Sequence, residues 1–449
     1  MKNAQIAQMP SLAQELKIKL ENRTATIAVV GLGYVGLPLV RAMHDAGFSV
    51  IGFDRDKEKV EFLNSGKTYL HHLGEDLVPH LTASDRFCPT SDESELAKAD
   101  AVILCVPTPL GKHNDPDMSY IVESTKMVAK TLHKGQLISL ESTTYPGTTR
   151  QHCQPILEES GLQCGEDFFV AYSPEREDPG RKGVDTQTIP KLVGGLDPVS
   201  TELAMTMYGA AVKETIAVES AEIAEAAKLL ENIYRAVNIA LVNELKPVLH
   251  DMGIDIWKVI DAASTKPFGY QAFYPGPGLG GHCIPIDPFY LTWKAKEYSH
   301  NTRFIELAGE INSKMPGYVV QRTAEGLNNM SKAIKGARIL VVGIAYKPDV
   351  DDIRETPAAK IIQLLAELGA EVSYHDPHVP NLSGMRNYNL EMDSADLTAD
   401  YVANCDCILI CTDHKAIDWQ LIGDTAQLIV DTRNAMSRLD SVKAPVIQA

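Results

Sequence analysis

Short apolar runs alternate with helix-length amphipathic segments in the first half of the chain. Each run has the length and the β-branched content of a buried strand, and these expected strands cover residues 25–30, 49–53, 101–106, 136–140 and 168–171. Between them lie segments long enough for helices, such as 37–46, which ends at Gly47. Strands connected by helices predict a parallel sheet with helices on both faces.

The last third of the chain repeats this pattern. Expected strands cover 337–343, 371–374, 406–411 and 428–431, and a helix is expected over 356–368. In the middle segment, about 220–330, apolar residues recur every three or four positions: Ile223, Ala227, Leu230, Tyr234, Val237, Leu241 and Val248. This spacing predicts one long helix, whose apolar stripe either faces the core or pairs with a second copy of the chain.

A glycine triplet follows the first expected strand directly. Gly31, Gly33 and Gly36 have the spacing Gly-x-Gly-x-x-Gly and open the helical segment. In such a turn the first glycine permits the tight bend, the second lets a pyrophosphate approach the backbone, and the third lets helix and strand pack closely. The sequence therefore predicts a dinucleotide site at this turn, with the helix N-terminus facing the phosphates.

An acidic residue ends the next expected strand. Asp54 lies 18 positions after Gly36, where its carboxylate can accept the ribose hydroxyls of a dinucleotide and would repel a 2′-phosphate. This favours NAD over NADP, although Arg55 and Lys59 supply nearby charge that a phosphate could use. The repeated unit has Gly343-Ile-Ala-Tyr-Lys347 in place of the triplet, so only the first unit is expected to bind NAD.

These patterns predict an α/β protein with two Rossmann-like, doubly wound parallel-sheet domains, joined by a helical middle domain with a long central helix. The expected parts are an N-terminal amphipathic helix over 1–24, an NAD-binding domain over 25–215, a central domain over 216–330 and a C-terminal domain over 331–449. Residues 1–23 lack the apolar block of a secretory signal peptide.

The composition limits the partners. The 449 residues carry 42 Lys and Arg against 59 Asp and Glu, which gives a net charge of −17. A surface of that charge repels nucleic acid and anionic membrane, so neither is an expected partner, and a phosphate-bearing ligand needs cations placed beside it. Eight cysteines in a chain of this size suit a reducing cytoplasm, and no apolar run is long enough to cross a bilayer.

One cysteine stands among many helix and strand breakers. Residues 275–288 read Pro-Gly-Pro-Gly-Leu-Gly-Gly-His-Cys-Ile-Pro-Ile-Asp-Pro, so Cys283 is expected on an ordered loop. A cysteine is most often an inert, buried apolar residue. Here the adjacent His282 and the acidic Asp287 favour a reactive nucleophile instead.

Three other cysteines, Cys405, Cys407 and Cys411, lie close to His414 in the sequence. Cysteine and histidine in such proximity are the usual ligands of zinc. The cysteines are expected on one face of the strand 406–411, however, and core packing explains them better. No metal site is expected.

Several motifs are similar, in the same order, to those of the UDP-glucose/GDP-mannose dehydrogenase family, and together they span nearly the whole chain. They are Gly31-Leu-Gly-Tyr-Val-Gly36, Val106-Pro-Thr-Pro109, Glu141-Ser-Thr143, Ser173-Pro-Glu175, Lys228 with Asn232, Gly280-Gly-His-Cys283 with Asp287, Lys347 with Arg354, and Asp431-Thr-Arg433. The resemblance implies an enzyme that oxidises the C6 primary alcohol of a nucleotide sugar to a carboxylate with two NAD.

The resemblance also implies roles for the catalytic residues. Cys283 matches the family's nucleophile, which holds the aldehyde as a thiohemiacetal and then as a thioester. Lys228 and Asn232, four positions apart on one helix face, match the pair that stabilises the negative oxygen. Asp287 matches the residue that takes protons through a water. Glu175 and Thr143 match the residues that position water for thioester hydrolysis.

Two sets of binding residues follow from the same resemblance. The residues expected at the NAD are Gly31, Gly33, Tyr34, Val35, Gly36, Asp54, Lys59, Thr108, Thr143 and Arg354. The residues expected at the UDP-sugar are Glu175, Arg176, Lys228, Asn232, Tyr270, Phe273, Gly276, Lys347 and Arg433. Lys347 and Arg433 follow C-terminal strands, where a doubly wound sheet presents ligands, and they supply the cations that the net charge requires.

The identity of the sugar depends on local resemblance. UDP-glucose members of the family typically carry Lys three positions after the nucleophile, where this chain has Ile286. Residues 172–180 and 189–195 resemble the UDP-N-acetylglucosamine members, which implies oxidation of that sugar for surface-polysaccharide synthesis. The alternatives are the same reaction on UDP-glucose, UDP-N-acetylmannosamine or UDP-N-acetylgalactosamine, a two-electron β-hydroxyacid-type dehydrogenase, and a nucleotide-sugar binder without activity. A homodimer or higher homo-oligomer through the central helix is expected.

Overall fold

The computed structural model describes residues 9–70, 73–74, 76–111, 114–176, 188–281, 283–385 and 388–449. Contacts within the chain divide it into two compact units, Met1–Glu231 with Trp293–Ser299 and Asn232–Thr292 with His300–Ala449. Two helices, α8 (Ala221–Asp251) and α10 (Cys283–Glu297), contribute residues to both units. The domain boundaries at residues 24, 215 and 330 stay predictions.

The first unit contains an eight-stranded sheet with the strand order β3-β2-β1-β4-β5-β6-β7-β8. The strands are β1 (Thr26–Val30), β2 (Ser49–Phe53), β3 (Phe87–Thr90), β4 (Ala101–Leu104), β5 (Leu137–Leu140), β6 (Phe169–Tyr172), β7 (Lys191–Gly195) and β8 (Thr215–Ala217). Neighbouring strands run parallel except for β6 and β7, which pair antiparallel. The expected parallel sheet is confirmed. Strands β3, β7 and β8 are additions to it, and β7 and β8 run opposite to the other strands.

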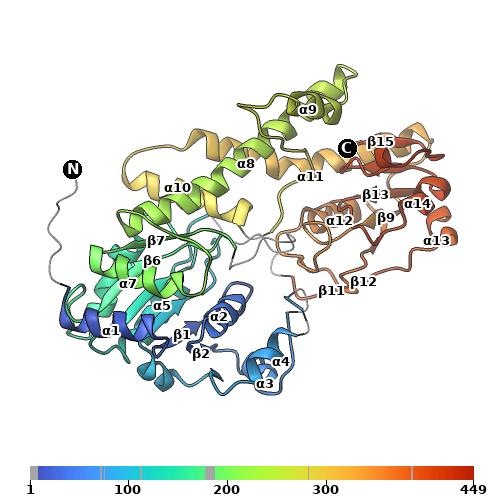
Figure 1. Ribbon diagram of the computed structural model, residues 1–449. Coiled ribbons are helices and arrows are strands. Elements are labelled where there is room, and N and C mark those ends of the chain that lie inside the picture. The colour runs from blue at the N-terminus through green and yellow to red at the C-terminus, as the bar shows by residue number, and fades with distance from the viewer. Residues whose placement is uncertain are drawn as a thin grey trace. The chain divides into compact units, whose positions relative to one another are not determined.

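Helices connect these strands and cover the sheet (Figure 1). They are α1 (Ser11–Glu21), α2 (Gly36–Asp45), α3 (Lys57–Asn64), α4 (Leu77–Thr82), α5 (Ser119–Ala129), α6 (Gln154–Glu158) and α7 (Pro198–Gly209), with the short 3₁₀ turn Glu93–Lys98 and the π turn Thr149–Cys153. Successive residues of β1 enter different cores, because Ile27 and Val29 pack in one cluster and Ala28 and Val30 in the other. Both faces of the sheet are therefore buried, as a doubly wound fold requires.

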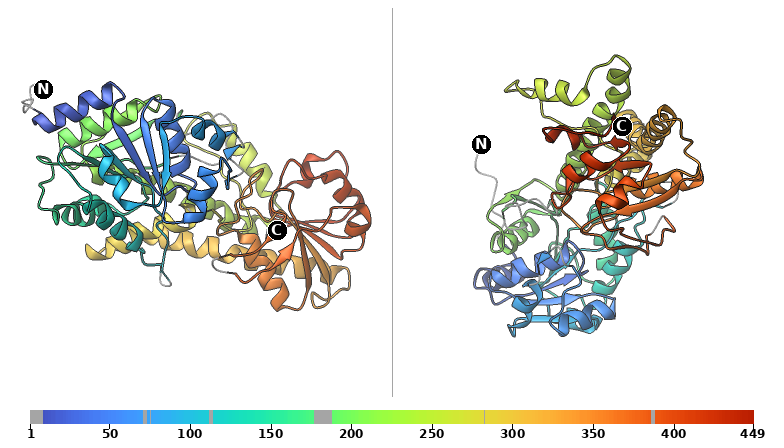
Figure 2. Two further views of the ribbon diagram at one scale, coloured as in Figure 1. Left: turned by 90° about the horizontal axis from the view of Figure 1, so that it is seen from below. Right: turned by 90° about the vertical axis from the view of Figure 1, so that its right-hand side faces the viewer.

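The second unit contains a five-stranded, all-parallel sheet with the order β10-β9-β13-β14-β15 (Figure 2). Its strands are β9 (Arg338–Val342), β10 (Glu371–His375), β13 (Cys407–Ile410), β14 (Ile429–Asp431) and β15 (Val446–Gln448), and β11 (Asn381–Leu382) pairs antiparallel with β12 (Met392–Asp393). The helices are α9 (Ile256–Ser264), α11 (Arg303–Asn329), α12 (Pro357–Glu367), α13 (Ala399–Ala403) and α14 (Trp419–Thr425), with the 3₁₀ turn Met436–Arg438. The repeat expected from the sequence is confirmed.

The cysteines near the end of the chain pack as apolar residues. Cys407 and Cys411 lie in one hydrophobic cluster of the second unit, and Cys405 lies in the cluster on the other face of the sheet. The expectation that all three share one face is therefore wrong for Cys405, because it precedes β13 and does not follow the alternation of that strand.

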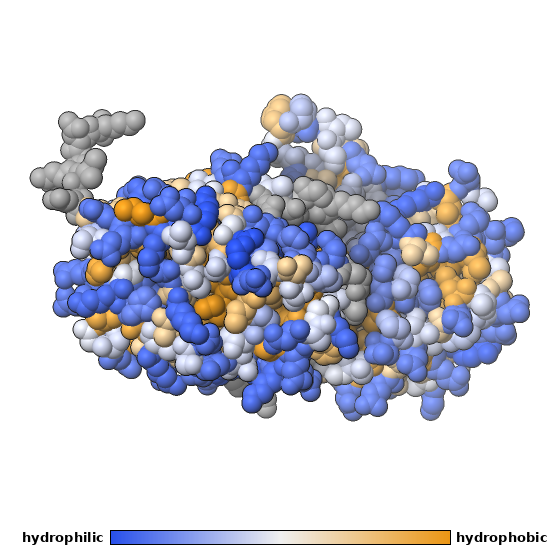
Figure 3. Space-filling model, turned by 60° about the horizontal axis from the view of Figure 1, so that its bottom comes forward, coloured by the Kyte–Doolittle hydropathy of each residue, from blue (hydrophilic) through white to orange (hydrophobic). Residues whose placement is uncertain are grey.

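The long helix predicted over the middle segment is α8, with 31 residues. Among the described residues, no helix is both long enough and apolar enough to span a membrane. Hydrophilic residues cover most of the surface visible in Figure 3, in agreement with the charged composition of the chain.

Candidate active site

Each glycine of the loop after β1 has a different packing constraint. Gly31 has a left-handed φ of +95°, and a Cβ there would lie 2.3 Å from the carbonyl oxygen of Cys105. A Cβ at Gly36 would lie 1.8 Å from the carbonyl oxygen of Gly31, so the first turn of α2 packs directly on the loop. A Cβ at Gly33 would meet no atom within 4 Å, and this open space is where the phosphates of a ligand can approach the backbone.

Asp54, which follows β2, connects this loop to the sheet. Its Oδ2 accepts the backbone N–H of Leu32 at 2.9 Å, and its Oδ1 accepts that of Asp56 at 3.0 Å. Lys59 Nζ lies 3.4 Å from Asp54 Oδ2, whereas Arg55 is paired with Glu123 at 2.8 Å. An open glycine loop next to a carboxylate fits the pyrophosphate and the ribose of a dinucleotide.

The second unit has the same turn in a closed form. Gly343 follows β9 with a φ of +83°, and a Cβ there would lie 2.3 Å from the carbonyl oxygen of Thr412. Asp376, which follows β10, accepts the backbone N–H of Ile344 at 2.7 Å, but its Oδ2 also lies 2.9 Å from Nε2 of the fully buried His414. This carboxylate is surrounded by protein, which explains physically why only the first unit offers an acid to a ribose.

Cys283 is the first residue of helix α10, which corrects the expectation of a loop. Pro285 lies in the first turn, where backbone N–H groups have no acceptor within a helix, so a proline costs no hydrogen bond there. Pro288 lies inside the helix. The preceding Gly281 has a φ of +77° and donates its N–H to the carbonyl oxygen of Arg354 at 2.9 Å. A helix N-terminus stabilises negative charge, which suits a reactive thiolate.

Asp287 lies one helical turn after Cys283 and is fully buried. Its Oδ2 accepts a hydrogen bond from Asn232 Nδ2 at 2.6 Å, and Asn232 is fully buried as well. Arg235 donates to the other end of the Asn232 amide, which fixes the orientation of that amide. The second unit therefore brings two of the expected catalytic residues into direct contact.

Lys228 lies four residues before Asn232 on the same face of α8, and it is 5% exposed. The part of the chain that the structure describes supplies no hydrogen bond or ion pair to its ammonium group. With no described anion beside it, this ammonium is suited to meeting a negative charge on a ligand.

Positive charge gathers around Arg433 in the second unit. Gly276 approaches this side chain closely, since a Cβ at Gly276 would lie 2.7 Å from Arg433 Nη1, and Asn243 Oδ1 accepts the Gly276 N–H at 3.0 Å. Burial lowers the pKa of the Arg433 guanidinium, whose Nε donates to the Cys411 carbonyl at 2.8 Å. Burial, together with Arg433, also lowers the pKa of Lys246 to about 7.

The remaining expected residues are more dispersed. Arg354 is bound through two nitrogens to Asp352, and the Nη2–Oδ2 distance is 2.6 Å. Tyr270 is 40% exposed. Thr108 is buried, and the half-buried residues are Tyr34, Val35, Thr143, Phe273 and Lys347. His282 lies outside the described residues, as do residues 177–187 of the segment that resembles UDP-N-acetylglucosamine members.

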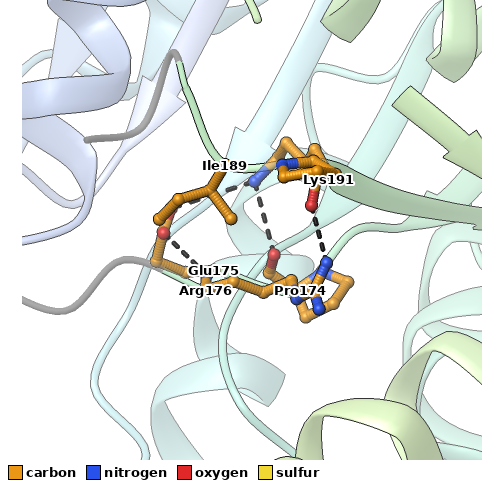
Figure 4. Close-up of a pocket in the computed structure, with 6 residues that line it drawn as sticks. Pro174, Glu175, Arg176, Ile189 and Lys191 are labelled. Atoms are coloured by element: carbon orange, nitrogen blue, oxygen red, sulfur yellow. Dashed lines mark hydrogen bonds and ion pairs between the residues drawn. The ribbon is translucent and has the colours of Figure 1, made fainter. Parts of the chain in front are cut away.

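Glu175 lies beside a lysine to which the sequence pattern gave no role (Figure 4). Lys191 Nζ is 3.8 Å from Glu175 Oε2 and 2.9 Å from Glu141 Oε2. Arg176 donates its backbone N–H to Glu175 Oε1 at 2.7 Å, and its guanidinium pairs with Glu231 at 2.7 Å. These contacts all lie within the first unit.

The sequence held one signal for Lys191 and Glu141. Each is a charged residue beside a run of mostly apolar residues, since Glu141 follows β5 and Lys191 begins β7. Only the antiparallel pairing of β7 with β6 brings the start of one strand to the end of the other. The direction of β7 had no sequence signal, so the pairing was not predicted.

Three family models match this chain in succession. The NAD binding domain of the UDP-glucose/GDP-mannose dehydrogenase family matches residues 25–212, its central domain matches 222–314 and its UDP binding domain matches 340–438. The chain belongs to this family. As a UDP-glucose/GDP-mannose dehydrogenase family member, it is an NAD-dependent oxidoreductase that acts on a UDP-sugar.

Similar members of the family differ in the sugar that they are named for. UDP-N-acetyl-D-glucosamine 6-dehydrogenase of Pseudomonas aeruginosa is 37% identical over 366 residues, which cover 81% of this chain and 85% of that protein. UDP-N-acetyl-D-mannosamine dehydrogenase of Pyrococcus horikoshii is 34% identical over 414 residues, 91% of this chain and 95% of that one. The solved structure of the Pyrococcus horikoshii dehydrogenase has a TM-score of 0.84 at 33% identity and covers 94% of this chain and 99% of its own.

The glycine loop of this family member supports a paired prediction. Gly36→Ala is expected to unfold or strongly destabilise the first unit, because its Cβ would lie 1.8 Å from a carbonyl oxygen. Gly33→Ala is expected to leave the melting temperature unchanged and to weaken NADH binding by about tenfold or more, because the methyl group enters the space for the phosphates. Thermal unfolding and NADH fluorescence titration measure both effects. Wild-type NADH affinity in Gly33→Ala would contradict the placement of the pyrophosphate.

Proposed function

We propose that the enzyme oxidises the C6 alcohol of UDP-N-acetylglucosamine to the uronate, and that Cys283 forms covalent intermediates with the sugar. The observation that carries the proposal is the buried hydrogen bond between Asn232 and Asp287, one turn from a cysteine at a helix N-terminus. A cysteine at a helix N-terminus, with a hydrogen-bonded carboxylate one turn away, supports covalent catalysis by the thiolate. The product is proposed to serve surface-polysaccharide synthesis.

The cofactor is proposed to be held by the first unit. The open loop at Gly33 would take the pyrophosphate of NAD, and Asp54 would take the adenosine ribose. Lys59 Nζ lies 3.4 Å from Asp54 Oδ2, so its ammonium is engaged by that carboxylate rather than left to bind a 2′-phosphate. When bound, NAD accepts a hydride in each of the two oxidations.

Cys283 is proposed to prevent loss of the aldehyde that forms at the midpoint of the reaction. Its thiolate adds to the aldehyde carbon and gives a thiohemiacetal, which becomes a thioester on the second oxidation. Water then cleaves the thioester, and the carboxylate is released while the thiolate is restored. Asp287, oriented by Asn232, is proposed to accept the protons through a water.

The cations are proposed to act on the negative oxygens of the substrate. The buried Lys228, with Asn232 on the same helix face, would stabilise the oxyanion of each tetrahedral intermediate. Arg433 beside Gly276, together with Lys347, would hold the diphosphate that a chain of charge −17 otherwise repels. Glu175 and Thr143 are proposed to position the hydrolytic water.

The choice of N-acetylglucosamine is supported by two observations. The 37% identical relative from Pseudomonas aeruginosa is named for that sugar, and residues 189–195 resemble the same group of enzymes. Ile286, at the position where UDP-glucose members carry lysine, is buried and apolar. UDP-N-acetylmannosamine is the second candidate, because the Pyrococcus horikoshii relative at 34% identity is named for it.

A panel of UDP-sugars tests this proposal. With UDP-N-acetylglucosamine the purified enzyme is expected to form two NADH per uronate, with kcat/KM at least about tenfold above that for UDP-glucose and the mannose and galactose epimers. NADH is followed by absorbance and the uronate by mass spectrometry. A higher kcat/KM with another sugar would overturn the assignment, one NADH per sugar would indicate a two-electron dehydrogenase, and binding without NADH would indicate a binder.

We also propose that α8 pairs with its copy in a second chain. Its exposed apolar residues follow the three- and four-residue spacing of a helix interface, and they include Leu230, Leu241 and Val248 at 66%, 51% and 51% exposure. The double variant Leu241→Glu with Val248→Glu is expected to sediment as a monomer, while Glu244→Gln on the same helix keeps the dimer. A wild-type chain that sediments as a monomer at about 10 μM, where an apolar interface of this kind stays associated, would contradict the proposal.

The thiols of Cys88, Cys105, Cys153, Cys164, Cys405, Cys407 and Cys411 are free. This supports the proposal that the enzyme works in the reducing cytoplasm, where a thiolate nucleophile stays available.

A further inference from the structure

Two oppositely charged side chains are buried where strands β5 and β7 of the first unit's sheet end and begin. Glu141 and Lys191 are 1% and 4% exposed, and their Oε2 and Nζ atoms lie 2.9 Å apart. The ammonium also lies 5.1 Å from the centre of the Tyr208 ring. A buried ion pair costs so much desolvation that stability alone does not explain its presence.

The Lys191 ammonium also faces Glu175. Its Nζ is 3.8 Å from Glu175 Oε2 and donates to the Pro174 carbonyl at 3.4 Å, while Glu175 Oε1 accepts the Arg176 N–H. Both oxygens of Glu175 are therefore oriented by neighbouring groups (Figure 4). Glu175, Lys191 and their chain neighbours line a hollow of about 10 Å³, which is close to the smallest space that holds one water molecule.

Burial and neighbouring charges shift the pKa values of this cluster in different ways. Burial lowers the pKa of Lys191, but the Glu141 and Glu175 carboxylates more than offset this, and the pKa lies above its ordinary value. Burial raises the pKa of Glu141, Lys191 opposes the rise and Glu175 adds to it. Burial and Glu141 also raise the pKa of Cys105 and of Tyr208, so both stay neutral. Lys191 is thus a permanent cation between two carboxylates.

We propose that Lys191, held in place by Glu141, is a positioning residue that fixes the orientation of the Glu175 carboxylate for its proposed part in thioester hydrolysis. The proposal rests on the hydrolytic role proposed above for Glu175. In that step Glu175 orients the water, the water oxygen bonds to the thioester carbon, its proton passes to Asp287, and the C–S bond breaks to restore the thiolate. Without Lys191, no cation opposes the rise that burial causes in the pKa of Glu141, and Glu175 loses the ammonium that faces its Oε2.

Rapid-mixing kinetics on the full-length enzyme, with UDP-N-acetylglucosamine or whichever panel sugar turns over, separates this role from a structural one. Lys191→Met is expected to lower steady-state NADH formation by about 30- to 300-fold. The NADH of the first turnover should change by less than about threefold, since it precedes hydrolysis. The acid limb of the steady-state pH profile should move to higher pH, and a thioester should accumulate on Cys283 in acid-quenched samples.

Three further variants complete the test. Lys191→Arg keeps the charge and is expected to recover to within about tenfold of the wild-type rate. Glu141→Gln releases the ammonium from its second partner and is expected to slow only the hydrolytic step, by about tenfold. The matched control is Lys98→Met, which removes an exposed lysine paired with Glu95 and should change neither phase.

Equal losses in the first turnover and in the steady state, with an unmoved pH profile and no thioester, would overturn the positioning role. If Lys191→Met fails to fold, the Glu141→Gln variant tests the proposal instead. Equal losses of its first-turnover and steady-state rates, or no loss of either rate, would overturn the proposal. A failure of the proposed function can be told apart from a failure of the positioning role. In the first case the wild-type enzyme itself forms no NADH from the UDP-sugar or carries no adduct on Cys283.

Discussion

Cys283→Ala is expected to lower steady-state NADH formation from the UDP-sugar by about 10³-fold or more. Without the thiol no thiohemiacetal forms, so the aldehyde either stays free or returns to the alcohol. Cys88→Ala is the matched control, because Cys88 is an exposed free cysteine of the same chain and should leave the rate unchanged. NADH absorbance measures both variants.

The fold of the Cys283→Ala variant should remain intact. The thiol is half-buried at the first residue of α10, where alanine is accepted, so the melting temperature is expected to change by less than about 3 °C. A Cys283→Ala enzyme that forms two NADH per sugar at the wild-type rate would exclude covalent catalysis by this residue.

Lys228→Met is expected to lower kcat by about 10²- to 10³-fold, the usual loss when a donor to an oxyanion is removed. The same substitution is expected to leave the melting temperature within about 3 °C of the wild-type value, because methionine fills the space of the mostly buried side chain and no described hydrogen bond or ion pair is lost. Steady-state kinetics and thermal unfolding measure the two quantities.

The control for Lys228→Met is Lys258→Met, which replaces an exposed lysine on α9 and should affect neither quantity by much. A Lys228→Met variant that loses stability and activity together would show that the lysine supports the fold rather than the oxyanion.

Strands β1, β2, β4, β5 and β6 of the first unit were predictable because each is a short, mostly apolar run between helix-length segments. The glycine loop and Asp54 were also found from the sequence, because backbone geometry dictates where glycine is needed. A methyl group that the fold tolerates at Gly33 would clash at Gly36. Strand β7 was not among the expected strands, and its direction had no signal either, because a strand's residue pattern is the same whether it runs parallel or antiparallel to its neighbour.

The residues around Cys283 show a second case in which the sequence pattern predicted the wrong local structure. Many glycines and prolines around it predicted a loop, yet a helix begins at the cysteine itself, since the first turn needs no N–H from Pro285. The contact between Asn232 and Asp287, 55 residues apart, depends on the packing of two helices, which spacing along the chain does not reveal. The resemblance to a family supplied both residues, and the structure supplied their hydrogen bond.

The central claim concerns a covalent bond between one sulfur and the substrate carbon. Rapid acid quench during turnover of the UDP-sugar with NAD, followed by peptide mass mapping, should find the sugar nucleotide attached to the peptide that contains Cys283. An enzyme that turns over two NADH per uronate while that peptide stays unmodified at every quench time would contradict the account.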